Sequence, residues 1–184
     1  MYEVVATCTG GSTAQVPLIM DVIAHSTQSA SATACEWLRS GSAAPAGTYE
    51  IRTSQRHGPA EDHVTNVAVG ARRESIAPDL RAVRTGAYDP LLLFRGTKVA
   101  AAHDFLHGMS GSRNWGGIEI YETPEGIYVA ELTRITGPDG HCVQRKHTAI
   151  GDAPQVVEGL LRSHSAEELL RPLRESNPQL FGNS

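Results

Sequence analysis

The stretch "IEIYETPEGIYVAELTRITGPDGHCVQRKHTAI" spans residues 118–150 and decides the expected fold. It contains three runs in which β-branched or aromatic residues alternate with polar ones, and "PEG" and "GPDG" separate these runs. A period of two is typical of strands with one buried face, and clusters of Gly, Pro and Asp are typical of turns. The stretch therefore predicts a three-stranded antiparallel meander, whose unpaired edge leaves room for self-association.

The rest of the chain groups strands with strands and adds short helices between or after them. The run 16–25 fits either a buried strand or a short helix. A predicted capping box of Ser165 and Glu168 begins the last helix. This order predicts an α+β fold, a mostly antiparallel sheet with several short helices packed on it. The other strand-like runs are 2–8, 48–56, 63–71 and 89–96, and the other predicted helices are 29–41, 77–86, 97–108 and 151–163.

Length and composition predict an ordinary globular chain. Its 184 residues are 40% hydrophobic and 20% charged, which fits one compact domain over 1–175 and a C-terminal tail over 176–184. A formal net charge of −4 disfavours a protein that holds nucleic acid by bulk charge. The longest apolar run is too short to span a bilayer, so we expect no membrane contact.

Residue usage also bears on the compartment. The first residues lack the basic region of a secretory signal, and three widely spaced cysteines form no C-x-x-C pair. Both features predict a reducing, cytoplasmic location. Among the 16 basic residues, Lys98 and Lys146 are the only lysines, and this excess of arginine is typical of a GC-rich genome.

The segment "HDFLHG" (103–108) differs by one methylene from the H-E-x-x-H signature of zinc hydrolases. On a helix, His103 and His107 would share one face and could bind a metal, with Asp104 in the position of the general base. Asp is shorter than Glu, and a catalytic zinc needs a third protein ligand that the motif does not supply. The distant candidates for that ligand are His63, His141, His147 and Glu119.

A structural interpretation of the same segment is stronger. His103 follows the helical spacing of Val99 and Leu106, which places it at the edge of a packed face. His107 falls in the last turn, where the helix dipole favours partial positive charge. We therefore expect no cofactor, and zinc on His103 and His107 remains the alternative.

The segment "MSGSRNWGG" (109–117) has the composition of a binding loop. It places hydroxyl and amide donors, one guanidinium group and one indole ring in a short glycine-rich connection. It matches neither a phosphate-binding loop nor a nucleophile elbow. The alternative is a long connection whose Trp115 packs on the sheet. The predicted binding residues are Ser110, Ser112, Arg113, Asn114 and Trp115.

Three basic clusters, "RTSQRH" (52–57), "ARR" (71–73) and "QRKH" (144–147), suggest an anion-binding surface. If the strands over 48–56 and 63–71 pair, we expect the arginines of the first two clusters near one end of the sheet, where they could bind phosphate. Those arginines are Arg52, Arg56, Arg72 and Arg73. Aromatic residues make up only 5% of the chain, so a stacking surface for single strands is weakly supported, and a solvated basic face is favoured.

Carboxylates on the predicted strands show no catalytic pair by spacing alone. Glu119 shares its alternation parity with Tyr121 and not with the isoleucines beside it, so we expect Glu119 to face away from the core.

These observations predict a small soluble binding or regulatory protein without a complete catalytic set. Its expected partner is an unknown protein or a small anionic ligand near the loop 109–117. One alternative is a metal-dependent hydrolase that uses the HDFLH segment. Another is a nucleic-acid-associated protein that uses the arginine clusters. The sequence leaves open whether the chain is an enzyme.

Overall fold

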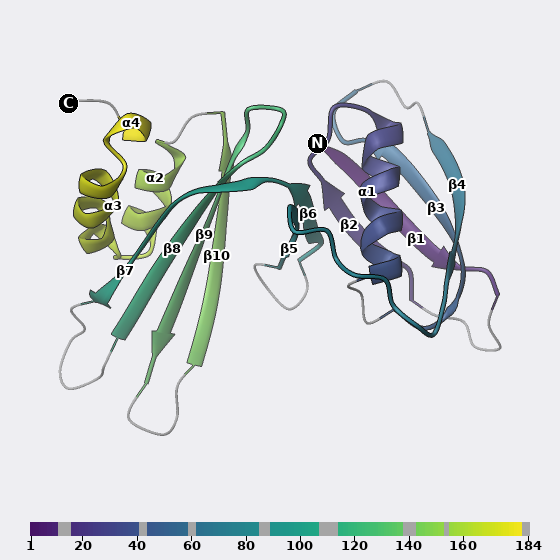
Figure 1. The fold of residues 1–184 in the computed structure, drawn as a ribbon, viewed down its shortest axis with the longest axis horizontal. Coiled ribbons are helices and arrows are strands. Elements are labelled where there is room, and N and C mark those ends of the chain that lie inside the picture. Colours follow the sequence, from purple (N-terminus) through teal and green to yellow (C-terminus); the bar gives the residue numbers. More distant parts are fainter. Residues whose placement is uncertain are drawn as a thin grey trace. The chain divides into compact units, whose positions relative to one another are not determined.

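The computed structural model describes residues 1–10, 16–40, 44–58, 62–84, 89–106, 114–137, 143–152 and 155–181. Contacts divide the chain into two compact units, each built on its own sheet (Figure 1). The first unit contains Met1–Val83 and the strand that ends at Arg95, and the second contains the chain from Gly96 onward. The prediction of one compact domain over 1–175, made from length and composition, stays a prediction.

The first unit is a six-stranded sheet with one helix, α1 (Thr27–Ser40), on it. The strand order is β4-β3-β1-β2-β6-β5, and every neighbouring pair is antiparallel except β2 and β6. The ambiguous run 16–25 therefore forms a strand. The strands are β1 (Tyr2–Cys8), β2 (Leu18–Val22), β3 (Gly47–Gln55), β4 (His63–Val69), β5 (Leu80–Val83) and β6 (Leu91–Arg95).

The helix α1 packs on the sheet through a stripe of small and apolar residues. Ala30, Ala34 and Leu38 recur every four residues and are fully buried. This spacing places them on one helical face, and alanine lets the helix approach the strands closely. On the sheet side, Val4 and Ile51 complete the same core, so the helix and the central strands form one packed layer.

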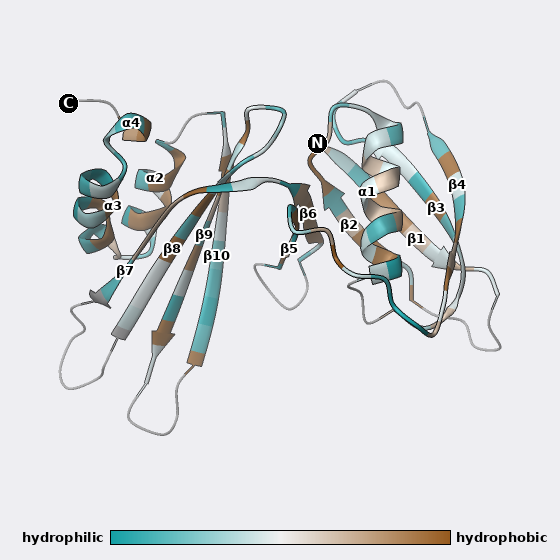
Figure 2. Cartoon of the chain, viewed as in Figure 1, coloured by the Kyte–Doolittle hydropathy of each residue, from teal (hydrophilic) through white to brown (hydrophobic). Residues whose placement is uncertain are grey.

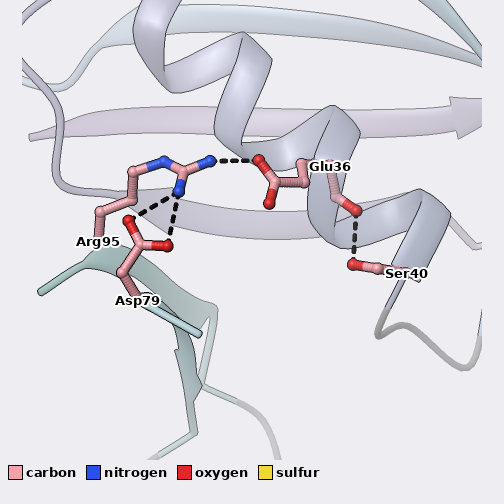
Figure 3. A network of polar contacts seen from close by, with 4 residues as sticks. All are labelled: Glu36, Ser40, Asp79 and Arg95. Carbon is pink, nitrogen blue, oxygen red and sulfur yellow. Dashed lines mark hydrogen bonds and ion pairs between the residues drawn. The ribbon is translucent and has the colours of Figure 1, made fainter. Parts of the chain in front are cut away.

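A charged network ties α1 to β6 and to the turn before β5 (Figure 3). The Arg95 guanidinium donates to both carboxylate oxygens of Asp79, at 3.0 and 2.8 Å, and also to Glu36 on the helix. The hydrogen bond from Arg95 holds the pKa of the Asp79 carboxyl below its usual range. An arginine that bridges two carboxylates in this way fixes geometry more firmly than a single ion pair.

Replacement of Arg95 by Gln is expected to lower the free energy of unfolding by about 1 kcal/mol at pH 7, because the network is half exposed and screened by water. Because the pKa of Asp79 is lower in the folded state, this stabilisation is fully present at any pH above the pKa of an unfolded Asp, which is about 4. It is lost as the pH falls through the lower pKa of the folded state. Urea unfolding at pH 7 and in steps down to pH 3 measures the difference. Arg52→Gln, which removes an exposed ion pair with Glu50, is the control and should not move the midpoint. A loss for Arg95→Gln that is the same at every pH would contradict this assignment.

The second unit is a four-stranded sheet in which each strand pairs with the next along the chain. All three pairings are antiparallel. The turn between the second and third strands contains Gly126, whose φ of 73° favours glycine. The strands are β7 (Thr97–Leu106), β8 (Asn114–Glu122), β9 (Tyr128–Thr136) and β10 (Val143–Gly151).

Short helices cover one face of this second sheet (Figure 1). Apolar and polar residues alternate along its strands (Figure 2), and the apolar set meets the helices. Ile118, Ile120 and Leu132 lie in this core together with Leu161 and Leu173. The helices are α2 (Val156–Ser163), the 3₁₀ turn η1 (Glu167–Leu169), α3 (Leu170–Ser176) and α4 (Pro178–Phe181). None of the helices in the described part of the chain has the length and apolar character that a membrane span requires.

Four sequence-based expectations are wrong in these segments. The predicted helix 97–108 is the strand β7 as far as Leu106, and the predicted helix 77–86 contains the strand β5. Ser165 has a φ of 49° and caps no helix, so the predicted capping box does not form. The region expected as a loose tail contains α4, whose Phe181 is buried in the core.

Candidate ligand-binding site

The sheet of the second unit has two chemically different faces. Ala100 and Ala102 of β7 and the isoleucines of β8 point toward the helices. Side chains alternate along a strand, so His103 and Glu119 point to the opposite face, called here the far face. The expectation that Glu119 faces away from the core is therefore confirmed.

Register aligns the far-face residues into rows across the four strands. The middle row contains His103, Gly117, Thr133 and Lys146, one residue from each strand. Because Gly117 and Thr133 are small, the middle of this face is hollow, while larger side chains stand around it. The hollow is a cavity of about 460 Å³, called here the far-face pocket, a volume within the range of small-molecule sites. Trp115, Ile135 and Gln144 lie on one side of this row, and Glu119 and Glu131 lie on the other.

The indole ring of Trp115 lies over Gly117. A Cβ atom built on Gly117 would be 2.9 Å from Cη2 of Trp115, closer than carbon atoms normally approach. Glycine at this position therefore leaves the space that the ring occupies. Across the strand pair, the ring of His103 is tilted by 35° at a centroid distance of 6.3 Å from Trp115. The two rings form an aromatic wall of the pocket.

The opposite side of the pocket consists of paired charges. Glu119 accepts a hydrogen bond from Lys98 Nζ at 2.9 Å and another from the Tyr121 hydroxyl at 2.5 Å. Glu131 accepts a hydrogen bond from Lys146 Nζ at 2.6 Å, and its side chain is only 12% exposed. Each carboxylate thus has its own lysine. These charges balance one another, so this side offers polarity without a strong net charge.

The structure describes two of the five predicted binding residues, Asn114 and Trp115. Trp115 lines the pocket as described, and Asn114 is the first residue of β8. Ser110, Ser112 and Arg113 lie outside the described residues. The sequence predicts Asn114 and Trp115 in a loop, but both lie in the strand β8, and their role in binding stays a prediction. Sequence patterns did not reveal that residues of other strands line the same pocket, namely Glu131, Thr133, Gln144 and Lys146.

The predicted metal ligands do not form the expected helical pair. His103 lies on the strand β7, and His107 lies outside the described residues. Residues four apart are neighbours on a helix but roughly 13 Å apart on a strand, so the H-x-x-x-H spacing loses its meaning in a strand. Asp104 and His147 point to the face opposite His103. In the described ranges, no group of three or more His, Cys, Asp or Glu side chains is arranged to hold a metal ion.

The predicted arginine surface of the first unit is also not assembled. The strands β3 and β4 pair antiparallel, so Arg56 follows the end of β3 beside the start of β4, while Arg72 and Arg73 follow the other end of β4. These arginines therefore lie near opposite ends of the hairpin. Arg56 pairs with Asp21 at 2.9 Å, and Arg73 donates to the carbonyl oxygen of Leu38 at 3.0 Å. Both support the fold of the unit.

The third basic cluster, "QRKH", is divided by strand alternation. Gln144 and Lys146 line the far-face pocket, and Arg145 and His147 point to the helix side of the sheet.

No family model, curated protein or solved structure matches this chain.

Proposed function

We propose that this chain is a non-catalytic binding protein that holds a small, polar, ring-shaped ligand in the far-face pocket. The observation that carries the proposal is the Trp115 ring over Gly117 in a hollow of about 460 Å³. An indole ring beside a cavity offers a large, rigid contact surface at low entropic cost. Polar groups around such a surface fix the orientation of a ligand.

The charges of the pocket favour an uncharged ligand. The sequence predicts a small anionic ligand, but the two lysines of the pocket are already paired with Glu119 and Glu131 and leave no excess positive charge for an anion. A free cation would compete with Lys98 and Lys146, which already neutralise the two carboxylates. Hydroxyl, amide or ring nitrogen groups can instead exchange hydrogen bonds with Thr133 and with the paired charges.

The same ion pairs favour binding over acid–base catalysis. Glu119 and Glu131 each accept a hydrogen bond from a lysine, so both carboxylates are engaged within the protein and neither is presented singly to a substrate. The hydrolase alternative required His103 and His107 to share one face of a helix, and His103 lies on a strand instead. The nucleic-acid alternative required the arginines of the first unit to form one surface, and they lie near opposite ends of a hairpin. Turnover of substrates by the purified protein across a broad hydrolase panel would count against the proposal.

Binding is tested by saturation-transfer NMR with a library of small, uncharged, ring-containing compounds such as nucleosides and pyranosides. We expect signals for a subset of compounds, and we expect Trp115→Ala to weaken their binding at least about tenfold, because a stacked ring contributes about 1–3 kcal/mol. Trp37→Phe, which alters the other tryptophan of the chain, is the matched control and should keep the signals. A library without any binder, or signals that persist in Trp115→Ala, would overturn the proposal.

A further inference from the structure

Four basic side chains gather on the helix side of the second sheet, away from the far-face pocket. Arg134 of β9 and Arg145 of β10 are directly paired in the register of the two strands. His147, two residues along β10 from Arg145, points to the same side. Its ring stacks on that of His164, the residue after α2, with centroids 3.7 Å apart and planes at 22°. These residues, Arg134, Arg145, His147 and His164, are called here the Arg-His cluster.

The cluster is rich in basic groups. Burial lowers the pKa of His147, and the positive charges of His164, Arg134 and Arg145 lower it further. On the neighbouring helix α2, Glu158 pairs with Arg162 at 3.7 Å and with Arg174 of α3, so its charge is already compensated. Asp104 of β7 lies in the same row as the two arginines, beyond Gly116, so one carboxylate faces two guanidinium groups. The row therefore keeps an excess of positive charge, which a bound anion would offset.

Donor groups in the cluster remain available. Arg134 donates one Nη1 hydrogen bond to the backbone oxygen of His164, which fixes the position of its guanidinium. The Nε of Arg134 is buried and has no hydrogen-bond partner within the described residues. Arg145 is exposed, and no ion pair or hydrogen bond engages its guanidinium in the described part of the chain. A buried donor without a partner is costly, and a ligand oxygen would satisfy it.

We propose that the Arg-His cluster is a binding site for a tetrahedral oxyanion, either free inorganic phosphate or the phosphate group of a small phosphomonoester. Planar guanidinium groups match the oxygens of phosphate and sulfate in geometry and charge. The stacked imidazoles add donors when they are protonated. A divalent cation does not fit the same place, because two guanidinium groups stand beside the histidines.

Anion binding at this cluster is coupled to proton uptake. A bound dianion stabilises the protonated form of His147, whose pKa is lowered in its absence, so the cluster binds the anion more tightly when this ring is protonated. The charged groups on this side of the sheet are Arg134 from β9, Arg145 from β10 and Asp104 from β7, with Glu158 and its two arginines on the helices. Affinity is therefore expected to rise by about tenfold between pH 7.5 and pH 6.0.

Sulfate is the primary probe, because it remains a dianion over this pH range while phosphate does not. Isothermal titration of the full chain with sulfate, in two buffers of different ionisation enthalpy, measures both affinity and proton uptake. We expect Arg145→Gln to weaken sulfate binding at least tenfold and His147→Gln to remove most of the pH dependence. Arg171→Gln, which removes one exposed arginine from α3, is the matched control and should change neither quantity.

The outcomes distinguish this site from general charge attraction and from other ligands. Equal weakening by Arg145→Gln and Arg171→Gln, or no sulfate binding at 10 mM and pH 6.0, would overturn the proposal. Inorganic phosphate and glycerol phosphate, titrated in parallel, distinguish a free anion from a phosphomonoester. A single-stranded oligonucleotide that binds much more tightly than either, with a steep salt dependence, would replace the small anion with nucleic acid and so refute the proposal. Thermal unfolding of each variant verifies that the exposed Arg145 can be replaced without loss of the fold.

Discussion

Replacement of Leu132 by Ala is expected to lower the free energy of unfolding of the second unit by about 3 kcal/mol. Leu132 is fully buried on the central strand β9 and belongs to the core between the sheet and its helices. Removal of its isobutyl group forfeits the transfer free energy of those carbons and leaves a cavity that close-packed neighbours fill only in part. A loss of this size is a large fraction of the stability of a small domain.

The two tryptophans make this expectation measurable unit by unit. Trp37 lies on α1 of the first unit and Trp115 on β8 of the second, and the chain contains no other tryptophan. In a Trp37→Phe background, urea unfolding followed by fluorescence reports the second unit through Trp115. Ile150→Ala, on the edge strand β10 and 36% exposed, is the control and should cost less than about 1 kcal/mol. Equal losses for Leu132 and Ile150 would contradict the assignment of this core.

Replacement of Gly117 by Val is expected to displace the Trp115 ring and to abolish the far-face pocket. The new Cβ would lie 2.9 Å from Cη2 of Trp115, and the ring is the group that can move, because Gly117 is fixed in the strand. The cost in stability is small, since a β-branched residue suits a strand better than glycine does. The cost in binding is large: any compound that binds the pocket should bind at least about tenfold more weakly, or about 1.4 kcal/mol.

Emission from Trp115 in the Trp37→Phe background follows the ring directly. We expect a shift to longer wavelength in Gly117→Val as the ring moves into solvent. Gly159→Ala is the matched control, because a Cβ added at this position of α2 meets nothing within 4 Å. It should leave the emission unchanged and raise stability by about 0.5–1 kcal/mol. An unchanged emission and unchanged binding in Gly117→Val would show that the ring does not occupy the space above this glycine.

Local alternation predicted the strands of 118–150 well, because its physical cause is local. In β8, isoleucine and polar residues take turns, and the sheet buries the first set while it exposes the second. The same rule predicts the orientation of Glu119. Partners across strands were not predictable in this way, because they depend on register. A shift of one residue between β9 and β10 would bring Arg145 to Thr133 in place of Lys146.

The strand β7 shows where local propensity fails. The residues "KVAAAHDF" favour a helix on intrinsic grounds, and their apolar spacing fits a helix as well as a strand. In the structure, Ala100 and Ala102 are buried beneath the helices, and the backbone pairs with β8 along its length. Tertiary pairing thus overrides a weak helical preference. The metal hypothesis for His103 and His107 depended on that helix and weakens with it.

The two sheets also differ in the sequence separation between the strands that pair in them. Each strand of the second sheet pairs with its sequence neighbour, and such low contact order is typical of fast folding. The first sheet instead requires the parallel pairing of Met20 with Leu91, and a large loop closes only when that contact forms. During synthesis from the N-terminus, the edge of β2 therefore remains unpaired until β6 emerges from the ribosome. Truncation before Leu91 would leave that edge permanently exposed, which makes such fragments prone to aggregation.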